Sequence, residues 1–163
     1  MDKRYTIKMG CADDWQDAMG LSWKTFLEFE GKVYPPSGIR NFNDFITDEK
    51  LYQMFLKGEY QMFCAFDTME KINGRYRLVG LVTLRNISHI SLLFVDKKYH
   101  RQGIGMGLID FIRNYLLSEV GCERVTVNAA PYGIPFYHYV GFRDLGPERM
   151  SDGILYTPME LFL

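Results

Sequence analysis

The sequence lacks several features that would identify a class of protein at once. It has no apolar run that approaches the roughly 20 residues of a membrane-spanning helix. The first ten residues, MDKRYTIKMG, turn polar too early for a secretory signal. The formal net charge is only -1, and no long block of Lys or Arg occurs. We therefore expect neither membrane insertion nor binding to nucleic acid, because a polyanion needs a broad basic face.

Cysteine is scarce, and its positions form no recognisable site. Cys11, Cys64 and Cys122 are odd in number, widely separated, and without metal-ligand spacing relative to the three histidines. We expect reduced cysteines, no metal and a cytoplasmic location. Repeats and low-complexity tracts are also absent from the sequence, and 163 residues that are 47% hydrophobic suffice for one sizeable core. We expect a single domain over residues 1–163.

The hydrophobic periodicity predicts a mixed α/β chain. Three strands joined by short turns, near residues 72–75 and 85–86, indicate an antiparallel meander. The strand, helix and strand around a later glycine-rich stretch imply a crossover, and therefore at least one parallel strand pair. Strands are predicted at residues 5–9, 60–66, 76–84, 87–95, 124–130 and 154–163. Helices are predicted at residues 15–27, near 39–45 and 49–56, from the glycines to about Gly121, and at 133–140. The first helix is expected to have its N-cap at Asp13 or Asp14.

Three glycines at alternate positions mark the first candidate site. The segment YHRQGIGMGL, residues 99–108, places Gly103, Gly105 and Gly107 between a predicted strand and a predicted helix. A helix N-terminus presents unpaired N–H groups and a partial positive charge, and glycines let an anion approach them. A tight turn is the alternative explanation, but it does not require three alternating glycines. We favour a phosphate-binding site.

Two familiar phosphate motifs fit this segment poorly. No Gly-Lys-Ser/Thr follows the glycines, which excludes a Walker loop. A dinucleotide fingerprint would match Gly103 and Gly105, but Leu108 stands in place of its third glycine, and no repeated βαβ series is present. A nicotinamide-dependent oxidoreductase is thus a weak alternative, which preferential binding of a dinucleotide would support.

The segment LLFVDKKYHRQGIGMGL, residues 92–108, resembles the acetyl-CoA-binding motif of the GCN5-related N-acetyltransferase (GNAT) superfamily, Gln/Arg-x-x-Gly-x-Gly/Ala. In the preferred register His100 stands at the Gln/Arg position, and Gly103 and Gly105 match. A register that starts at Gln102 also satisfies the pattern. The preferred register places Leu108 at the usual apolar position of the helix.

A second segment, NAAPYGIPFYHYVGF at residues 128–142, resembles a later motif of the same superfamily. Tyr137, Gly141 and Phe142 match that motif. The Asn often found seven residues before the Tyr is replaced by Ala130, and Asn128 lies two positions earlier. The order of the two segments makes the joint match more specific than a glycine pattern alone.

The resemblance implies a mixed, mainly antiparallel twisted sheet flanked by helices, and an N-acetyltransferase that uses acetyl-CoA. It implies that the pyrophosphate lies over the backbone amides of residues 101–106 and that the pantetheine arm lies along residues 93–95. A bulge at Phe94 or Val95 would let a backbone N–H polarise the thioester carbonyl. The expected coenzyme-binding residues are Leu93, Phe94, Val95, Arg101, Gln102, Gly103, Ile104, Gly105, Met106 and Asn128.

Tyr137 is the candidate general acid for the departing thiolate, because a phenol with a pKa of about 10 stays protonated at neutral pH. A core or rim aromatic is the alternative role for this residue. The general base is unassigned. His89 is one candidate and a structural strand histidine the alternative, whereas Glu28 and Glu30 suit either proton transfer through water or a plain surface role.

The acceptor is expected to be a small-molecule or peptide amine, attacked directly because no catalytic cysteine signature occurs. Trp23, Phe26, Phe29 and Tyr34 are predicted to form one wall of its pocket, with core packing as the alternative, and VYPPSG at residues 33–38 to form a semi-rigid lid. The alternative function is a non-catalytic acyl-CoA-binding or regulatory module. Dimers are the commonest assemblies, which makes a homodimer the expectation to test.

Overall fold

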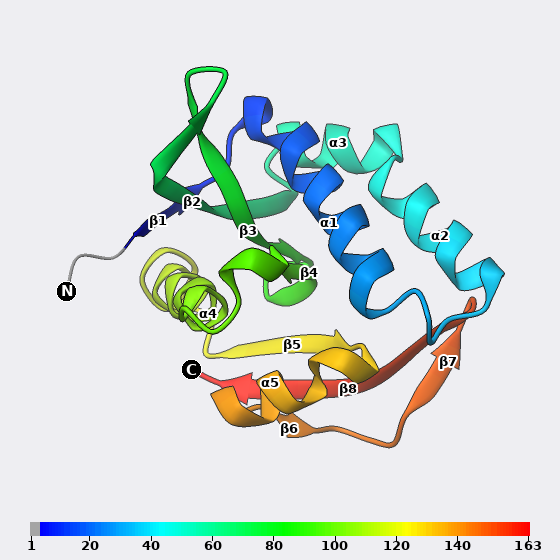
Figure 1. The fold of residues 1–163 in the computed structure, drawn as a ribbon. Coiled ribbons are helices and arrows are strands. Elements are labelled where there is room, and N and C mark those ends of the chain that lie inside the picture. The colour runs from blue at the N-terminus through cyan, green and yellow to red at the C-terminus, as the bar shows by residue number, and fades with distance from the viewer. Residues whose placement is uncertain (1–3) are drawn as a thin grey trace.

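The computed structural model describes residues 4–163, which form an eight-stranded sheet with helices on both faces (Figure 1). The strands are β1 Tyr5–Met9, β2 Tyr60–Ile72, β3 Arg75–Arg85, β4 His89–Val95, β5 Arg124–Ala129, β6 Arg143–Asp144, β7 Arg149–Ser151 and β8 Ile154–Phe162. The helices are α1 Trp15–Phe29, α2 Pro36–Ile46, α3 Glu49–Leu56, α4 Ile104–Tyr115 and α5 Ile134–Val140. Short helical turns are η1 Ala12–Asp14, η2 Lys97–Tyr99, η3 Leu116–Val120 and η4 Pro131–Gly133.

The sheet is mixed and mainly antiparallel, as predicted. Its strand order is β1-β2-β3-β4-β5-β8-β6, and β7 pairs separately with β8. The one parallel pair joins β4 to β5, and the crossover between them contains α4. The meander is therefore confirmed as β2, β3 and β4, and the predicted parallel pair is confirmed as β4 and β5.

Apolar side chains on both faces of the sheet explain why helices cover both. Neighbouring residues of a strand point to opposite faces. Phe63 and Ala65 of β2 accordingly pack into the cluster beneath α4, whereas Met62 and Cys64 pack into the cluster beneath α1. Figure 1 shows α4 on one side of the sheet and α1 to α3 on the other.

Helix α1 begins where predicted, with Asp14 at its N-cap position, whereas the capping interaction and the start of α2 differ from the prediction. Asp14 does not cap α1 through its side chain, because η1 precedes the helix and turns the carboxylate back. That carboxylate accepts a hydrogen bond from the Cys11 N–H at 2.9 Å and pairs with Arg75 at 2.6 Å. Pro36 begins α2 three residues before the predicted start, since a proline fits the first turn of a helix, where no N–H is needed.

The strands β6 and β7 were not predicted. They are two and three residues long, too short to show a periodic pattern, and both form only by pairing with β8. Their pairing folds the segment after α5 back over β8. The tip of the β7–β8 hairpin then reaches the start of α2 (Figure 1).

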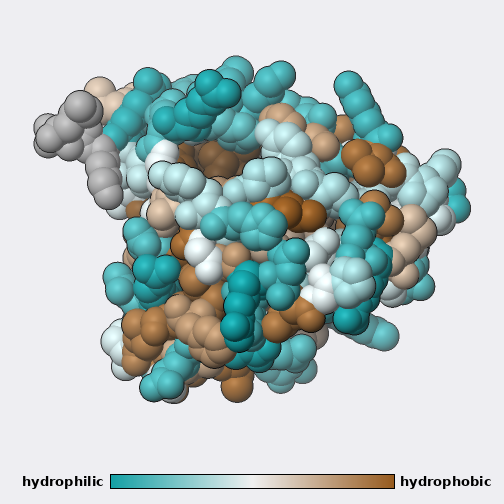
Figure 2. All heavy atoms as spheres, turned by 90° about the horizontal axis from the view of Figure 1, so that it is seen from below, coloured by the Kyte–Doolittle hydropathy of each residue, from teal (hydrophilic) through white to brown (hydrophobic). Residues whose placement is uncertain are grey.

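On the face shown in Figure 2, neither hydrophilic nor hydrophobic side chains predominate. Hydrophilic and hydrophobic side chains alternate there, and apolar side chains are visible at the bottom of a hollow. No helix within residues 4–163 is long and apolar enough to span a bilayer.

Candidate active site

The two parallel strands separate after two residue pairs, and this separation makes the site. His89 pairs with Thr126 and Ile90 with Val127, after which β4 and β5 diverge. In the described chain, residues 92–95 therefore pair only with β3, and the other edge of β4 is open from Ser91 onward. A cavity of about 1360 Å³ lies there, lined by parts of α1, α2, β4, α4, η4, α5 and the β7–β8 hairpin.

The loop after β4 presents backbone amides to this cavity. Gly103 adopts φ +81°, a left-handed conformation, and serves as the N-cap of α4. The first helical amide to find an acceptor is that of Gly107, which donates to the Gly103 carbonyl at 2.9 Å. The preceding amides of Ile104, Gly105 and Met106 have no acceptor within their own helix. An anion is the natural partner for such a cluster of amides.

The three alternating glycines have different physical reasons. Gly103 needs its positive φ, as described above. A Cβ on Gly105 would lie 3.0 Å from the ring of Phe136, so this glycine lets α5 approach the loop. A Cβ on Gly107 would lie 3.0 Å from Ile7 and 3.2 Å from the Tyr5 hydroxyl. Gly107 thus serves the packing of α4 against β1, and only the first two glycines face the cavity.

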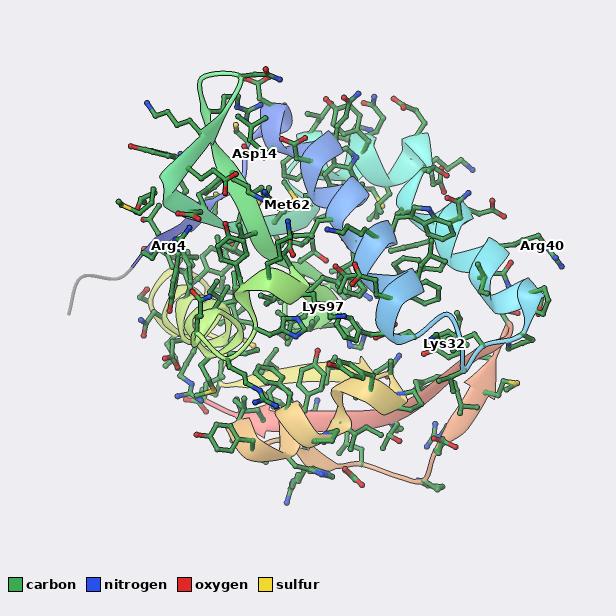
Figure 3. The ribbon with its side chains drawn as sticks, viewed as in Figure 1. Arg4, Asp14, Lys32, Arg40, Met62 and Lys97 are labelled. Carbon is green, nitrogen blue, oxygen red and sulfur yellow. The ribbon has the colours of Figure 1, made fainter. Side chains whose placement is uncertain are left out.

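A buried carboxylate holds the turn that precedes this loop. The Tyr99 hydroxyl donates to Asp67 at 2.6 Å, and Arg4 forms a 3.1 Å ion pair with the same carboxylate (Arg4 is labelled in Figure 3). Asp96, also buried, pairs with Arg77 at 3.4 Å and with Lys24 at 3.8 Å. These contacts tie η2 to β2, β3 and α1, and so fix where the loop begins.

The irregularity in β4 lies earlier than predicted. Thr83 pairs with Leu92 and Leu84 with Ile90, so the extra residue is Ser91. Phe94 and Val95 pair regularly with β3, and the predicted bulge at these two residues is therefore wrong. The physical reason is local: the Thr83 hydroxyl takes the hydrogen bond of the Leu92 N–H at 3.0 Å and so accommodates the irregularity there.

Three stacked rings lie near the point where β4 and β5 diverge. The Phe29 ring lies 5.1 Å from the ring of His100 and 4.6 Å from that of Tyr132. His100 also donates through Nε2 to the Val95 carbonyl at 2.8 Å. The histidine at the Gln/Arg position of the motif thus links the loop to both β4 and α1.

Tyr137 is placed by the residues of its own motif. Its carbonyl accepts hydrogen bonds from the N–H groups of Gly141 at 3.2 Å and Phe142 at 2.9 Å, and the left-handed Gly141 ends α5. Its ring packs edge to face on Phe142 at 5.1 Å. Burial, and next the negative charge of Glu30, raise the pKa of Tyr137. The phenol is consequently protonated throughout the neutral range.

The structure separates the three candidate bases. Glu30 lines the cavity, and burial raises its pKa to about 7. His89 also lines it, but burial and then the charge of Arg85 lower its pKa to about 4, and its Nδ1 lies 2.8 Å from the Thr126 hydroxyl. Glu28 is exposed and is not among the lining residues. A group that titrates near neutral pH suits proton transfer, which favours Glu30.

Most predicted site residues meet at this cavity. Of the predicted pocket aromatics, Trp23 is not a lining residue, because it packs against Phe26 and Phe42 from behind. Gln102 is the one predicted coenzyme residue that does not line the cavity. Lys97, labelled in Figure 3, lines it and was not predicted. The predicted residues that do line it are Phe26, Phe29, Glu30, Tyr34, His89, Leu93, Phe94, Val95, Arg101, Gly103, Ile104, Gly105, Met106, Asn128 and Tyr137.

The segment predicted to form a semi-rigid lid, and the first turns of α2 after it, are anchored to the β7–β8 hairpin. The Tyr34 hydroxyl donates to the Leu155 carbonyl at 3.0 Å, and Asn41 donates to the Asp152 carbonyl at 2.6 Å. Gly38 lies so close to the backbone of Gly153 that a Cβ would meet its carbonyl oxygen at 2.2 Å. These contacts join the segment and α2 to the β7–β8 hairpin at one end of the cavity.

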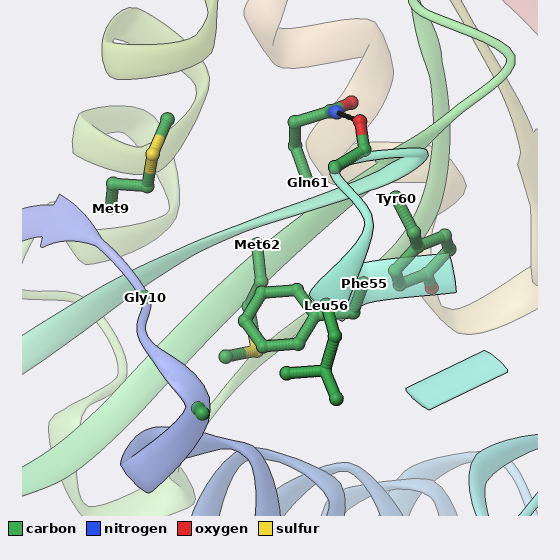
Figure 4. A pocket seen from close by; sticks show the side chains of 9 residues that line it. Met9, Gly10, Phe55, Leu56, Tyr60, Gln61 and Met62 are labelled. Atoms are coloured by element: carbon green, nitrogen blue, oxygen red, sulfur yellow. Dashed lines mark hydrogen bonds between the residues drawn. The ribbon is translucent and has the colours of Figure 1, made fainter. Parts of the chain in front are cut away.

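A second, smaller pocket lies away from this site. It has a volume of about 250 Å³ and lies between the end of β1, the end of α3 and the start of β2 (Figure 4). Its lining is mainly apolar, with Met9, Phe55, Leu56 and Met62, and it includes no ionisable side chain other than Tyr60. It shares no residue with the large cavity.

Comparisons with known proteins agree with this geometry. The sequence profile of the acetyltransferase (GNAT) domain matches residues 30–163. No curated protein sequence matches the chain.

No group of three His, Cys, Asp or Glu side chains within residues 4–163 is placed to hold a metal ion.

Solved structures share the fold at low sequence identity. A GCN5-related N-acetyltransferase from Rhodopseudomonas palustris matches with a TM-score of 0.76 and 19% identity, over 97% of this chain and 95% of that one. The PaiA N-acetyltransferase of Thermoplasma acidophilum, in complex with coenzyme A, matches with a TM-score of 0.76 and 17% identity over the full length of both chains. A spermidine N-acetyltransferase from Vibrio cholerae, in complex with CoA and spermine, matches with a TM-score of 0.66 and 15% identity, over 99% and 95%.

Proposed function

Since the chain belongs to the acetyltransferase (GNAT) family, we propose that it moves an acetyl group from acetyl-CoA directly to a primary amine. One observation carries this proposal. The amides of residues 104–106, the open edge of β4, Glu30 and Tyr137 all face one cavity. An anion site, an extended binding edge, a base and an acid are the parts that this reaction needs.

The coenzyme fits the residues present. The amides at the start of α4 suit the pyrophosphate, with the guanidinium of Arg101 and the ammonium of Lys97 available as additional cations on the lining. The unpaired edge of residues 91–95 suits an amide-bearing arm, which would pair with it as an added strand does. Asn128 lines the opposite wall on β5. Bound acetyl-CoA supplies the activated acetyl group as a thioester.

Glu30 is the proposed base. It accepts a proton from the ammonium of the acceptor, which frees the nitrogen lone pair to attack the thioester carbonyl. A bond forms between nitrogen and the acetyl carbon, and the carbon–sulfur bond breaks. The nitrogen loses its second proton, and the proton on Glu30 leaves to solvent.

Tyr137 is the proposed acid, and Glu30 assists it. Tyr137 donates its phenolic proton to the departing thiolate, and the second proton of the nitrogen restores the phenol through water. The charge of Glu30 is one cause of the raised pKa of Tyr137. Once Glu30 has taken a proton, that charge is gone and the phenol becomes the stronger acid, at the step where its proton is needed.

The test is Tyr137→Phe, assayed by release of free CoA thiol and by acetyl-CoA binding. We expect turnover to fall by about 10²–10⁴-fold, the usual contribution of a general acid, while the Kd for acetyl-CoA stays within a factor of about three. Phe keeps the ring contacts with Phe136 and Phe142, so the fold is preserved. Unchanged turnover would remove Tyr137 from the mechanism. Acetyl-CoA binding without turnover on any amine would favour a non-catalytic acyl-CoA-binding module instead.

A further inference from the structure

The end of the cavity that faces α2 and the β7–β8 hairpin, here called the acceptor end, is lined mainly by aromatic side chains, of which Phe42 is partly exposed while the others are largely covered by their neighbours. Four rings form a continuous wall, here called the aromatic wall: Phe26, Tyr34, Phe42 and Phe94. The Phe26 ring stacks on Phe42 at 4.0 Å and on Tyr34 at 5.4 Å. Phe42 meets Phe94 of β4 edge to face at 5.9 Å. The wall therefore runs from α2 to the strand proposed to hold the pantetheine arm.

We propose that the acceptor is a small monoamine with an aromatic or alkyl body, which lies along the aromatic wall with its amine toward Glu30. This inference rests on the proposed acetyltransferase function and specifies its substrate class. Ring surface of this kind gains free energy by covering apolar groups. A second ammonium against the rings would gain a cation–π contact, but it would lose hydration that this contact only partly returns.

The charges on the lining support a single ammonium. Glu30 and Asp152 are the lining carboxylates of the described chain, and Asp152 lies exposed at the hairpin tip. The basic lining residues are Arg85, Lys97 and Arg101. A polyamine would have to place a second or third ammonium against rings or near these cations, which costs desolvation and repulsion. A monoamine needs only Glu30.

Contacts between the start of α2 and the β7–β8 hairpin bridge the acceptor end and favour a small acceptor there. The backbone of Gly38 touches that of Gly153, and the Asn41 side chain is bonded to the Asp152 carbonyl. Tyr34 bonds the same hairpin at Leu155. A lysine side chain or an N-terminus on a folded protein would have to displace these contacts for its chain to continue past the acceptor end.

The first experiment compares acceptors on the unaltered protein. Rates of thiol release are measured with acetyl-CoA and with 2-phenylethylamine, hexylamine, ethylamine, putrescine or spermidine. We expect kcat/KM for 2-phenylethylamine and hexylamine to exceed that for putrescine and spermidine at least tenfold. Ethylamine, which has the amine and almost no body, should have a KM at least tenfold higher than 2-phenylethylamine, since its missing carbons leave the wall uncovered.

The second experiment tests the wall itself. Phe42→Ala removes one partly buried ring, and we expect the ratio of kcat/KM between 2-phenylethylamine and ethylamine to fall about tenfold, with KM for acetyl-CoA unchanged. Phe55→Ala is the matched control, because Phe55 packs partly buried in the same core cluster but does not line this cavity. Its ratio should match that of the unaltered protein.

The outcomes separate the two proposals. Faster turnover of spermidine or putrescine than of 2-phenylethylamine would overturn the monoamine inference and leave the acetyltransferase function in place. An unchanged ratio in Phe42→Ala would overturn the placement of the substrate body on the wall. Absence of thiol release with every amine would overturn both proposals.

Discussion

Glu30→Gln is expected to change the pH dependence of stability in a direction that burial alone dictates. Burial raises the pKa of Glu30 from its ordinary value of 4.5 to about 7. The folded protein therefore holds this proton more tightly than the unfolded chain does. The resulting stability is complete below pH 4.5 and is lost as the pH rises to about 7. The interval corresponds to at most about 3 kcal/mol of unfolding free energy.

The assay is urea unfolding between pH 4.5 and 8. The glutamine variant cannot ionise at this position, so the stability of the unaltered protein relative to the variant should fall by up to about 3 kcal/mol across that interval. Glu28→Gln is the matched control, because Glu28 lies two residues earlier, in the last turn of α1, and is exposed and outside the cavity. Its unfolding free energy should run parallel to that of the unaltered protein at every pH.

The same variant tests the proposed base. In the unaltered protein kcat/KM for the amine should rise with an apparent pKa near 7, as Glu30 loses its proton. In Glu30→Gln this limb should vanish and the rate at pH 7.5 should fall about 10²–10⁴-fold. Parallel stability curves for Glu30→Gln and the unaltered protein would refute the raised pKa. A retained limb near pH 7 would refute the assignment of Glu30 as base.

Three further changes have outcomes set by local geometry. Gly103→Ala puts a side chain on a residue with φ +81°, so it should cost about 1–2 kcal/mol in urea unfolding and raise KM for acetyl-CoA. Tyr99→Phe removes the hydroxyl that donates to the buried Asp67 at 2.6 Å, and the expected cost in the same assay is about 1.5–3 kcal/mol. KM for acetyl-CoA should again rise, because η2 leads into the loop proposed to bind the coenzyme. Ile87 has a branched, 61% exposed side chain at φ +75°, a backbone conformation that asparagine adopts with less strain. Ile87→Asn should therefore raise the unfolding free energy by about 1 kcal/mol and raise the midpoint of thermal unfolding; a lower midpoint would show that the turn is not strained.

Local patterns in the sequence were sufficient to predict the elements that are long enough to show a period. The strands of the meander, α1 and the start of α4 lie close to their predicted ranges, because alternation and helical spacing express burial on one or two faces. The glycine segment and the Tyr137 segment could likewise be recognised from the order of their own residues. Their residues act mainly through backbone conformation and short-range contacts, such as the left-handed Gly103 and Gly141.

The sequence could not choose among His89, Glu28 and Glu30 as base, since that choice depends on burial and on neighbours distant in the chain. It also misplaced the irregularity of β4, which is accommodated by the Thr83 side chain on the adjacent strand. The stack of Phe29 between His100 and Tyr132 joins residues about 70 and 100 positions apart, and no local period records such a contact.

By itself the sequence determined a mixed sheet, a glycine turn at the start of α4 and a tyrosine in a short helix, because each depends on side chains within a few residues of one another. Only the tertiary structure decided that β4 and β5 separate after two pairs, that Glu30 is the carboxyl whose charge raises the pKa of Tyr137, and that several aromatic side chains line the end of the cavity beside α2. Solvent exclusion by distant segments sets the pKa of a carboxyl and the character of a cavity, and it exists only after the chain has folded.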